Sequence, residues 1–161
     1  MACHATRTLI GTVLLNTAIV LTAVADPGKL VSADDLSQLA AESEQRRLPI
    51  LLMVSQYHCG FCDRMKEEVL QPMRLSGEYR NRVLMRELSI DPGETITNFQ
   101  GEPETAADFI HQYEVHVTPT LLFLDAEGKE AAERIVGINT VDYLIFYIEE
   151  AIDEATAEIV H

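Results

Sequence analysis

The chain has 161 residues, of which 26 are acidic and 12 are basic, so its formal net charge is −14. This length is sufficient for one domain with its own hydrophobic core. The sequence has no continuous basic stripe, which excludes nucleic acid and anionic membrane surfaces as expected partners.

The first 25 residues differ in composition from the rest of the chain. A short, weakly cationic start precedes a mostly apolar stretch over 9–24, which ends in the small residues Ala23-Val24-Ala25. This pattern is typical of a cleavable secretory signal peptide, and the stretch is short and polar for an uncleaved membrane anchor. We therefore expect a signal peptide at 1–25, a linker at 26–33 and a folded domain at 34–161, in a periplasmic or otherwise exported protein.

The folded domain is expected to begin with a helix and a buried strand. Ser32 and Asp35 have the spacing of a capping box, and apolar residues then recur at helical intervals over 36–47. Pro49 ends this helix. The continuous apolar run at 50–54 is typical of a strand that is covered on both faces.

A second helix and a second strand follow. Apolar residues at intervals of three and four predict a helix from Cys59 to about Gln71, with Pro72 and Gly77 bounding the helix and its short continuation. We expect a strand at 82–90, and then a polar segment that contains a β-like piece at 95–99.

The last third of the chain is expected to contain helix, strand, strand and helix. A helix at 105–113 precedes a buried strand at 120–124, a turn at 125–128 and a partner strand at 129–136. A long amphipathic helix follows from about residue 141. Alternating strands and helices that close with a hairpin predict an α/β fold, with a mixed parallel and antiparallel sheet covered by helices on both faces.

The motif Cys59-Gly60-Phe61-Cys62 lies where the first buried strand meets the second helix. Two thiols separated by two residues can close reversibly into a disulfide, and the helix N-terminus favours the thiolate form of the first. A charged His58 would favour the same form. A purely structural bridge is the weaker interpretation, because so short a loop restrains the unfolded chain little. The pair therefore indicates thiol–disulfide exchange.

With Val117-Thr118-Pro119-Thr120 before a later strand, this motif resembles the thioredoxin superfamily over about residues 32–155. The small exported thioredoxin-like proteins of the sulfur-oxidation type are the most similar overall. The resemblance implies that Cys59 is the attacking thiol and that Cys62 is the buried resolving thiol. It also implies that Pro119 is cis and lies against the disulfide, and that the backbone of Thr118 binds an extended substrate segment.

The sequence departs from cytoplasmic thioredoxins at several positions. Those proteins have tryptophan before the first cysteine and Gly-Pro between the pair, where this chain has His58 and Gly60-Phe61, which we expect to modulate the site. They also bury an aspartate six residues before the first cysteine, where this chain has Met53. The large helical insertion of the periplasmic oxidants is absent, which favours reduction or isomerisation over oxidation.

These observations predict an exported enzyme that reduces or isomerises protein disulfides through Cys59 and Cys62, with Phe61 as an apolar contact for substrates. We expect no cofactor, a redox partner protein, no membrane association after signal cleavage, and a monomer. Two alternatives stay open on the same fold. The protein could bind zinc or copper, with His58, His111 and His116 joining the cysteines, or it could be a non-catalytic module that docks a partner.

Overall fold

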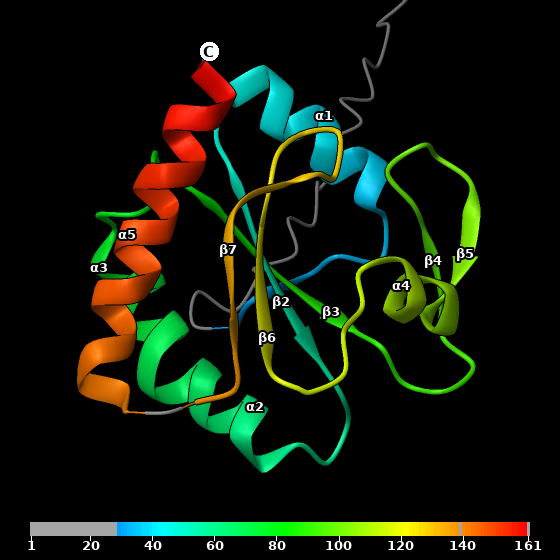
Figure 1. Ribbon diagram of the computed structural model, residues 1–161, viewed down its shortest axis with the longest axis horizontal. Helices are drawn as coiled ribbons and strands as arrows, with labels where there is room; N and C mark the ends of the chain where they lie inside the picture. The colour runs from blue at the N-terminus through cyan, green and yellow to red at the C-terminus, as the bar shows by residue number, and fades with distance from the viewer. Residues whose placement is uncertain (1–28, 139, 161) are drawn as a thin grey trace, which may run out of the picture.

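The computed structural model describes residues 29–138 and 140–160, and it has a central sheet of five strands in the order β1-β3-β2-β6-β7 (Figure 1). The predicted signal peptide at 1–25 lies outside the described residues. β1, β3 and β2 run parallel, and β6 and β7 each run antiparallel to the preceding strand in that order. The predicted mixed sheet is therefore confirmed. Its strands are β1 (Val31–Ser32), β2 (Ile50–Ser55), β3 (Leu84–Ser89), β6 (Thr120–Leu124) and β7 (Glu130–Val136).

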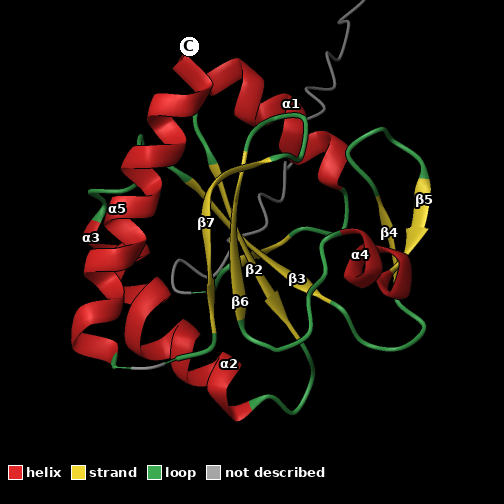
Figure 2. Ribbon diagram, in the orientation of Figure 1, coloured by secondary structure: helices red, strands yellow, loops and turns green. Residues whose placement is uncertain are grey.

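Helices cover both faces of this sheet, as the sequence predicted (Figure 2). One face packs against the helical segment that follows Cys59 and against α5 (Val141–Val160), and the other packs against α1 (Leu36–Arg46) and α4 (Ala106–Gln112). None of the helices in the described part of the chain has both the length and the hydrophobicity that crossing a bilayer requires.

Every residue of β2 is buried, because this strand lies between β3 and β6 and has a helical layer on each side. Leu51 and Met53 pack into the cluster that contains Cys62, whereas Ile50, Leu52 and Val54 pack into the opposite cluster. This alternation follows from the two-residue period of a strand, and it explains why β2 is continuously apolar from Ile50 to Val54.

The helix after Cys59 is longer than predicted. It runs without a break through α2 (Gly60–Met65), the π-helical segment η1 (Lys66–Leu70) and α3 (Gln71–Ser76), and Gly77 caps it with a φ of 79°. Pro72 lies inside this run. Proline has no N–H to donate and its ring crowds the carbonyl four residues earlier, and the wider π turn just before it accommodates both effects.

Two predictions at the start of the domain are wrong. Val31 and Ser32 pair with β3, and Ala33 is buried, so the described part of the expected 26–33 linker belongs to the fold. Ser32 does not cap α1. The side chain of Asp35 accepts the N–H of Gln38 at 3.1 Å and caps the helix instead. A two-residue strand is too short to produce a recognisable hydrophobic period.

The polar segment before α4 forms a small hairpin. β4 (Thr95–Thr97) lies within the β-like piece predicted at 95–99, and it pairs antiparallel with β5 (Pro103–Thr105), a strand that was not predicted. The loop of this hairpin lies close to Gly128, in the turn between β6 and β7. Gly128 has a φ of 81°. A Cβ atom on Gly128 would lie 2.6 Å from Cδ2 of Phe99, so glycine is required there for space as well as for conformation.

Thr105 ends β5 and caps α4, which leads to a testable expectation for stability. Its hydroxyl oxygen accepts the N–H of Asp108 at 3.2 Å, and the carboxylate of Asp108 accepts the N–H of Thr105 at 3.4 Å. We expect Thr105→Ala to lower the free energy of unfolding by about 1 kcal/mol, because it leaves a helix N–H without its acceptor. Urea unfolding at pH 7 measures this change.

The matched control is Thr95→Ala, which removes the same hydroxyl from the residue that pairs with Thr105 across the hairpin but caps no helix. Thr105→Ser, which keeps the hydroxyl, should retain most of the stability. An equal loss from both alanine variants would contradict the assigned cap.

Candidate functional site

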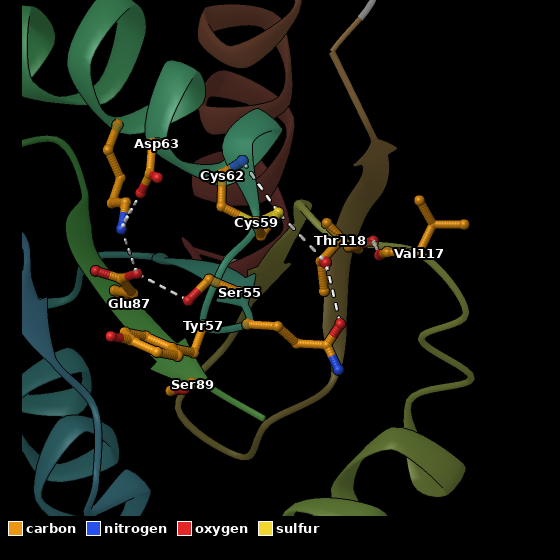
Figure 3. Close-up of a disulfide and its surroundings, with 12 residues drawn as sticks. Ser55, Tyr57, Cys59, Cys62, Asp63, Glu87, Ser89, Val117 and Thr118 are labelled. Atoms are coloured by element: carbon orange, nitrogen blue, oxygen red, sulfur yellow. Dashed lines mark hydrogen bonds and ion pairs between the residues drawn. A yellow bond between two sulfur atoms is a disulfide. The ribbon is translucent and has the colours of Figure 1, made fainter. Parts of the chain in front are cut away.

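Cys59 and Cys62 form a disulfide at the carboxyl end of β2, where the chain enters α2 (Figure 3). The two sulfur atoms are 2.07 Å apart and the Cα atoms 5.1 Å apart. Cys59 is the N-cap residue of α2 and is partly exposed, whereas Cys62 in the first turn is fully buried. A molecule approaching from solvent therefore reaches the sulfur of Cys59 and not that of Cys62.

Two donors point at the sulfur of Cys59. The backbone N–H of Cys62 donates to it at 3.1 Å, and the hydroxyl of Thr118 donates to it at 3.5 Å. Oε1 of Gln56 is a second acceptor for the same hydroxyl, at 3.4 Å, so the single proton of Thr118 is donated either to the sulfur or to Gln56. Donors directed at a sulfur stabilise its anionic form more than its neutral form. The arrangement therefore favours a thiolate at Cys59 once the disulfide is reduced.

The structure brings Thr118, which was predicted from the sequence as a site residue and precedes Pro119, to within 3.5 Å of the Cys59 sulfur. Thr118 is half-buried and Pro119 is buried at the start of β6, the antiparallel neighbour of β2, and the peptide bond between them is cis. The two segments are separated by more than 50 residues in the chain, and the pairing of β2 with β6 is what joins them.

Exposed apolar side chains occur within two residues of Cys59 and next to Thr118 in the chain. Phe61 is 60% exposed, as the sequence analysis expected, and Tyr57 and Val117 are 77% and 51% exposed. Large apolar side chains grouped on a surface mark sites of contact with other molecules. Of these three side chains, only Phe61 was predicted from the sequence as a substrate contact.

The two other residues that were expected to modulate the site have different surroundings. His58 has a φ of 59°, a conformation uncommon for residues other than glycine, and its ring lies 4.0 Å from that of Tyr57. A Cβ atom added to Gly60 would meet no atom within 4 Å, so space does not require glycine at that position.

Asp91 holds the loop that leads from β2 to Cys59. Its two carboxylate oxygens accept the N–H of Tyr57 at 2.9 and 3.1 Å, and one also accepts the hydroxyl of Ser89. The bond from Ser89, followed by that from Tyr57, lowers the pKa of Asp91 below its usual value. From the sequence, Asp91 was placed only in the polar segment after the strand predicted at 82–90, with no role at the site. The carboxyl ends of parallel strands meet at one edge of a sheet, and this rule applied to β2 and β3 could have identified it.

A polar cluster lies between the sheet and the helix that carries Cys62. Met53 is buried there, and its neighbour across the parallel pair is Glu87 of β3. Oε1 of Glu87 accepts the hydroxyl of Ser55 at 2.7 Å and the ammonium of Lys66 at 3.1 Å (Figure 3). Lys66 also lies 3.3 Å from Asp63.

Ser55 is buried, and the side chains of Glu87 and Lys66 are 17% and 25% exposed. Burial lowers the pKa of Lys66, but its bonds to Glu87 and Asp63 outweigh that effect and leave the pKa raised. This cluster leaves no pattern in the sequence, because its members come from three separate elements.

The three histidines considered for metal binding do not converge with the cysteines. His111 lies on α4 and His116 in the loop beyond it, and both are exposed. Within residues 29–138 and 140–160, no group of three or more His, Cys, Asp or Glu side chains is placed to hold a metal ion.

Comparison with known proteins agrees with this architecture. Residues 36–152 match the model of the thioredoxin-like domain family. The chain belongs to this family. No curated protein matches the sequence.

Solved structures share the fold at low sequence identity. A thioredoxin h from Nicotiana alata is 22% identical, with coverage of 81% of this chain and 98% of that one and a TM-score of 0.53. The DsbH oxidoreductase is 19% identical, with coverage of 85% and 95% and a TM-score of 0.58. A poplar thioredoxin h is 23% identical, with coverage of 72% and 86% and a TM-score of 0.52. At this identity, the likeness concerns the fold alone.

The thioredoxin-like fold together with the Cys59–Cys62 pair at disulfide distance supports thiol–disulfide oxidoreductase chemistry in general. The fold also points to protein thiols as substrates and redox partners.

Asp91→Ala tests whether this carboxylate orders the loop before Cys59. We expect the protection of the Tyr57 amide against hydrogen exchange to fall in this variant, because the amide loses both of its acceptor atoms. In the wild type the pKa of Asp91 is lowered, so its contribution is present above about pH 3.8 and is lost as the pH falls through the folded-state value. Protection of Tyr57 should therefore decrease on acidification.

Hydrogen exchange followed by NMR, with rates normalised to those of an unstructured chain, makes this measurement. Asp108→Ala, at the start of α4, is the control for loss of a carboxylate and should leave Tyr57 protected. Unchanged protection in Asp91→Ala would show that the loop is held by other contacts.

Proposed function

We propose that this protein is an exported thiol–disulfide oxidoreductase of the small, sulfur-oxidation thioredoxin type, which reduces or isomerises disulfides of other proteins through Cys59 and Cys62. One observation carries the proposal: the partly exposed sulfur of Cys59 receives two donors, while its buried partner Cys62 lies one turn behind it. The signal-peptide pattern at 1–25 supports a periplasmic or other exported location, and its removal leaves only these two cysteines.

The reaction begins with the reduced pair. The thiolate of Cys59 attacks one sulfur of a substrate disulfide, which forms a mixed disulfide and releases the other substrate sulfur as a thiolate that takes up a proton. Cys62 then loses its proton and attacks the sulfur of Cys59. This step releases the second substrate thiol and leaves the Cys59–Cys62 disulfide that the structure contains.

Two electrons pass from the protein to the substrate in this sequence, so a redox partner protein must reduce the pair again. Isomerisation uses the same mixed disulfide. In that case another thiol of the substrate attacks the intermediate and displaces Cys59, and the pair returns to the reduced state without a net change of electrons. The protein acts as a monomer in this proposal, because one chain supplies both cysteines.

An extended substrate segment is bound beside Cys59. The backbone of Thr118, before Pro119, supplies hydrogen-bonding groups, and the exposed side chains of Phe61, Tyr57 and Val117 supply apolar contact.

The proton of Cys62 needs an acceptor, because this thiol is sealed from solvent. Glu87 occupies the layer that Cys62 shares with Met53, and its carboxylate is hydrogen-bonded to Ser55 at the end of β2. We propose that Glu87, the neighbour of Met53 on β3, takes this proton through the Ser55 hydroxyl or a water. Lys66 holds the carboxylate in place.

Cys62→Ser tests the roles of the two cysteines. We expect this variant to accumulate a mixed disulfide with a reducible substrate such as insulin, because the second attack is blocked while the first proceeds. Non-reducing gel electrophoresis and mass spectrometry detect the adduct and locate it at position 59.

The matched control is Cys59→Ser, which should form no adduct because the remaining thiol is buried. Trapping through position 62 would reverse the assigned roles. Failure of Cys62→Ser to trap any oxidised protein would overturn the proposal and favour a binding module.

Glu87→Gln tests the proton acceptor. We expect the second step to slow by about 100-fold, the lower end of the usual contribution of a general base, while alkylation of Cys59 in the reduced protein keeps its rate. Rapid-mixing measurement of substrate release from a preformed mixed disulfide gives the rate of this step. Glu67→Gln, an exposed acid on the helical segment that follows Cys59, is the control and should leave both rates unchanged.

Urea unfolding of each variant shows whether the fold is retained. An equal loss of both rates in Glu87→Gln would mean that Glu87 supports the structure of the site and not the proton transfer.

A further inference from the structure

An arginine-rich pocket lies away from the disulfide. Four of the 12 basic side chains of this acidic protein line one cavity of about 560 Å³, namely those of Arg46, Arg74, Arg80 and Arg86. Arg46 ends α1, Arg74 belongs to α3, Arg80 follows the Gly77 cap, and Arg86 lies on β3. The fold therefore gathers these guanidinium groups from four separate segments.

The pocket includes the end of the sheet that is opposite to Cys59. Leu84 and Met85, which start β3, line it, whereas Cys59 follows the carboxyl end of the parallel strand β2. Figure 1 shows the same separation, because the end of α1 and the start of α2 lie at opposite ends of the sheet. A ligand in this pocket would not contact the cysteines.

Among the residues that line the pocket, Glu42 is the single acidic one. Its two carboxylate oxygens are both used, one by Nη1 of Arg46 at 2.8 Å and the other by Nη2 of Arg86 at 2.5 Å. The second amino group of Arg46 donates to the carbonyl of Arg80 at 2.6 Å. One carboxylate thus faces four guanidinium groups, and the lining has a net charge of +3.

Arg74 and Arg80 have no acidic partner among the described residues. Nη1 of Arg74 is buried and donates no hydrogen bond within the described part of the chain. A buried guanidinium N–H without an acceptor is costly, and the crowding of like charges adds to that cost. Both costs would be removed by an anion that accepts from several of these groups at once.

We propose that this pocket is a binding site for a compact oxyanion of the phosphate or sulfate type, either free or carried by a small molecule. The planar fork of each guanidinium matches the oxygen atoms of such a group in a bidentate manner. Arg74 and Arg80 supply the unpaired donors, and Arg46 and Arg86 are held in place by Glu42. The overall charge of −14 repels anions at long range, so the affinity arises from these short contacts within about one Debye length.

The test is titration of the reduced or oxidised full-length protein with inorganic phosphate and, separately, with chloride at the same ionic strength, followed by NMR of backbone amides. We expect phosphate to produce saturable shifts grouped at residues 42–46 and 74–86, and chloride to produce none of them. A titration with an organic phosphate monoester distinguishes the two sources of the group, because tighter binding of the ester would identify a carried phosphate.

Variants separate specific binding from the general stabilisation of proteins by phosphate. Arg74→Gln and the exposed Arg80→Gln should each weaken binding at least tenfold, whereas Arg64→Gln, on the surface of α2, should leave the affinity unchanged. Arg80→Gln keeps the test valid if Arg74→Gln unfolds. Formation of the Cys62→Ser mixed disulfide should not change in any of these backgrounds, so failure here and failure of the oxidoreductase proposal are distinguishable.

Three outcomes would overturn the proposal. They are shifts that do not saturate, equal shifts with chloride, and an affinity for phosphate that survives both Arg74→Gln and Arg80→Gln.

Discussion

The burial of β2 on both faces is the constraint on which the rest of the structure depends. Because β2 lies between β3 and β6 and beneath two layers of helices, its carboxyl end occupies a fixed position in the core. The chain must leave the sheet there and turn into a helix, which places Cys59 at the helix N-terminus and Cys62 under the helix. The neighbouring strands then deliver Asp91 to the exit loop and Thr118 to the sulfur.

The charge of the protein makes local contacts decisive. A chain with a formal charge of −14 resists the gain of another negative charge, so a thiolate at Cys59 depends on nearby donors and not on the overall field. Donors at 3.1 and 3.5 Å meet this need. Local contacts also determine the charge of the arginine-rich pocket at the other end of the sheet. There the fold brings together four arginines that the sequence distributes over about 40 residues.

The interior beneath Cys62 differs from that of the thioredoxins that the sequence resembles. Met53 occupies the place of their buried aspartate, and the acidic group lies instead on β3 as Glu87, paired with Lys66 from the helix. An isolated carboxylate would be expensive in this layer, and the ammonium at 3.1 Å offsets much of that cost. A carboxylate can therefore remain in this layer, beside Met53, although β2 is entirely apolar up to Val54.

The sequence by itself determined the features that depend on the order of neighbouring residues. The apolar run of β2, the helical spacing after Cys59 and the cysteine motif between them predicted the fold class and the reactive pair, because each reports a regular period or a short fixed spacing. Only the tertiary structure decided which distant groups meet. The strand β1, the anchoring of Tyr57 by Asp91, the cluster around Glu87 and the arginine-rich pocket all depend on strand register and on packing between elements, which leave no periodic signal in the chain.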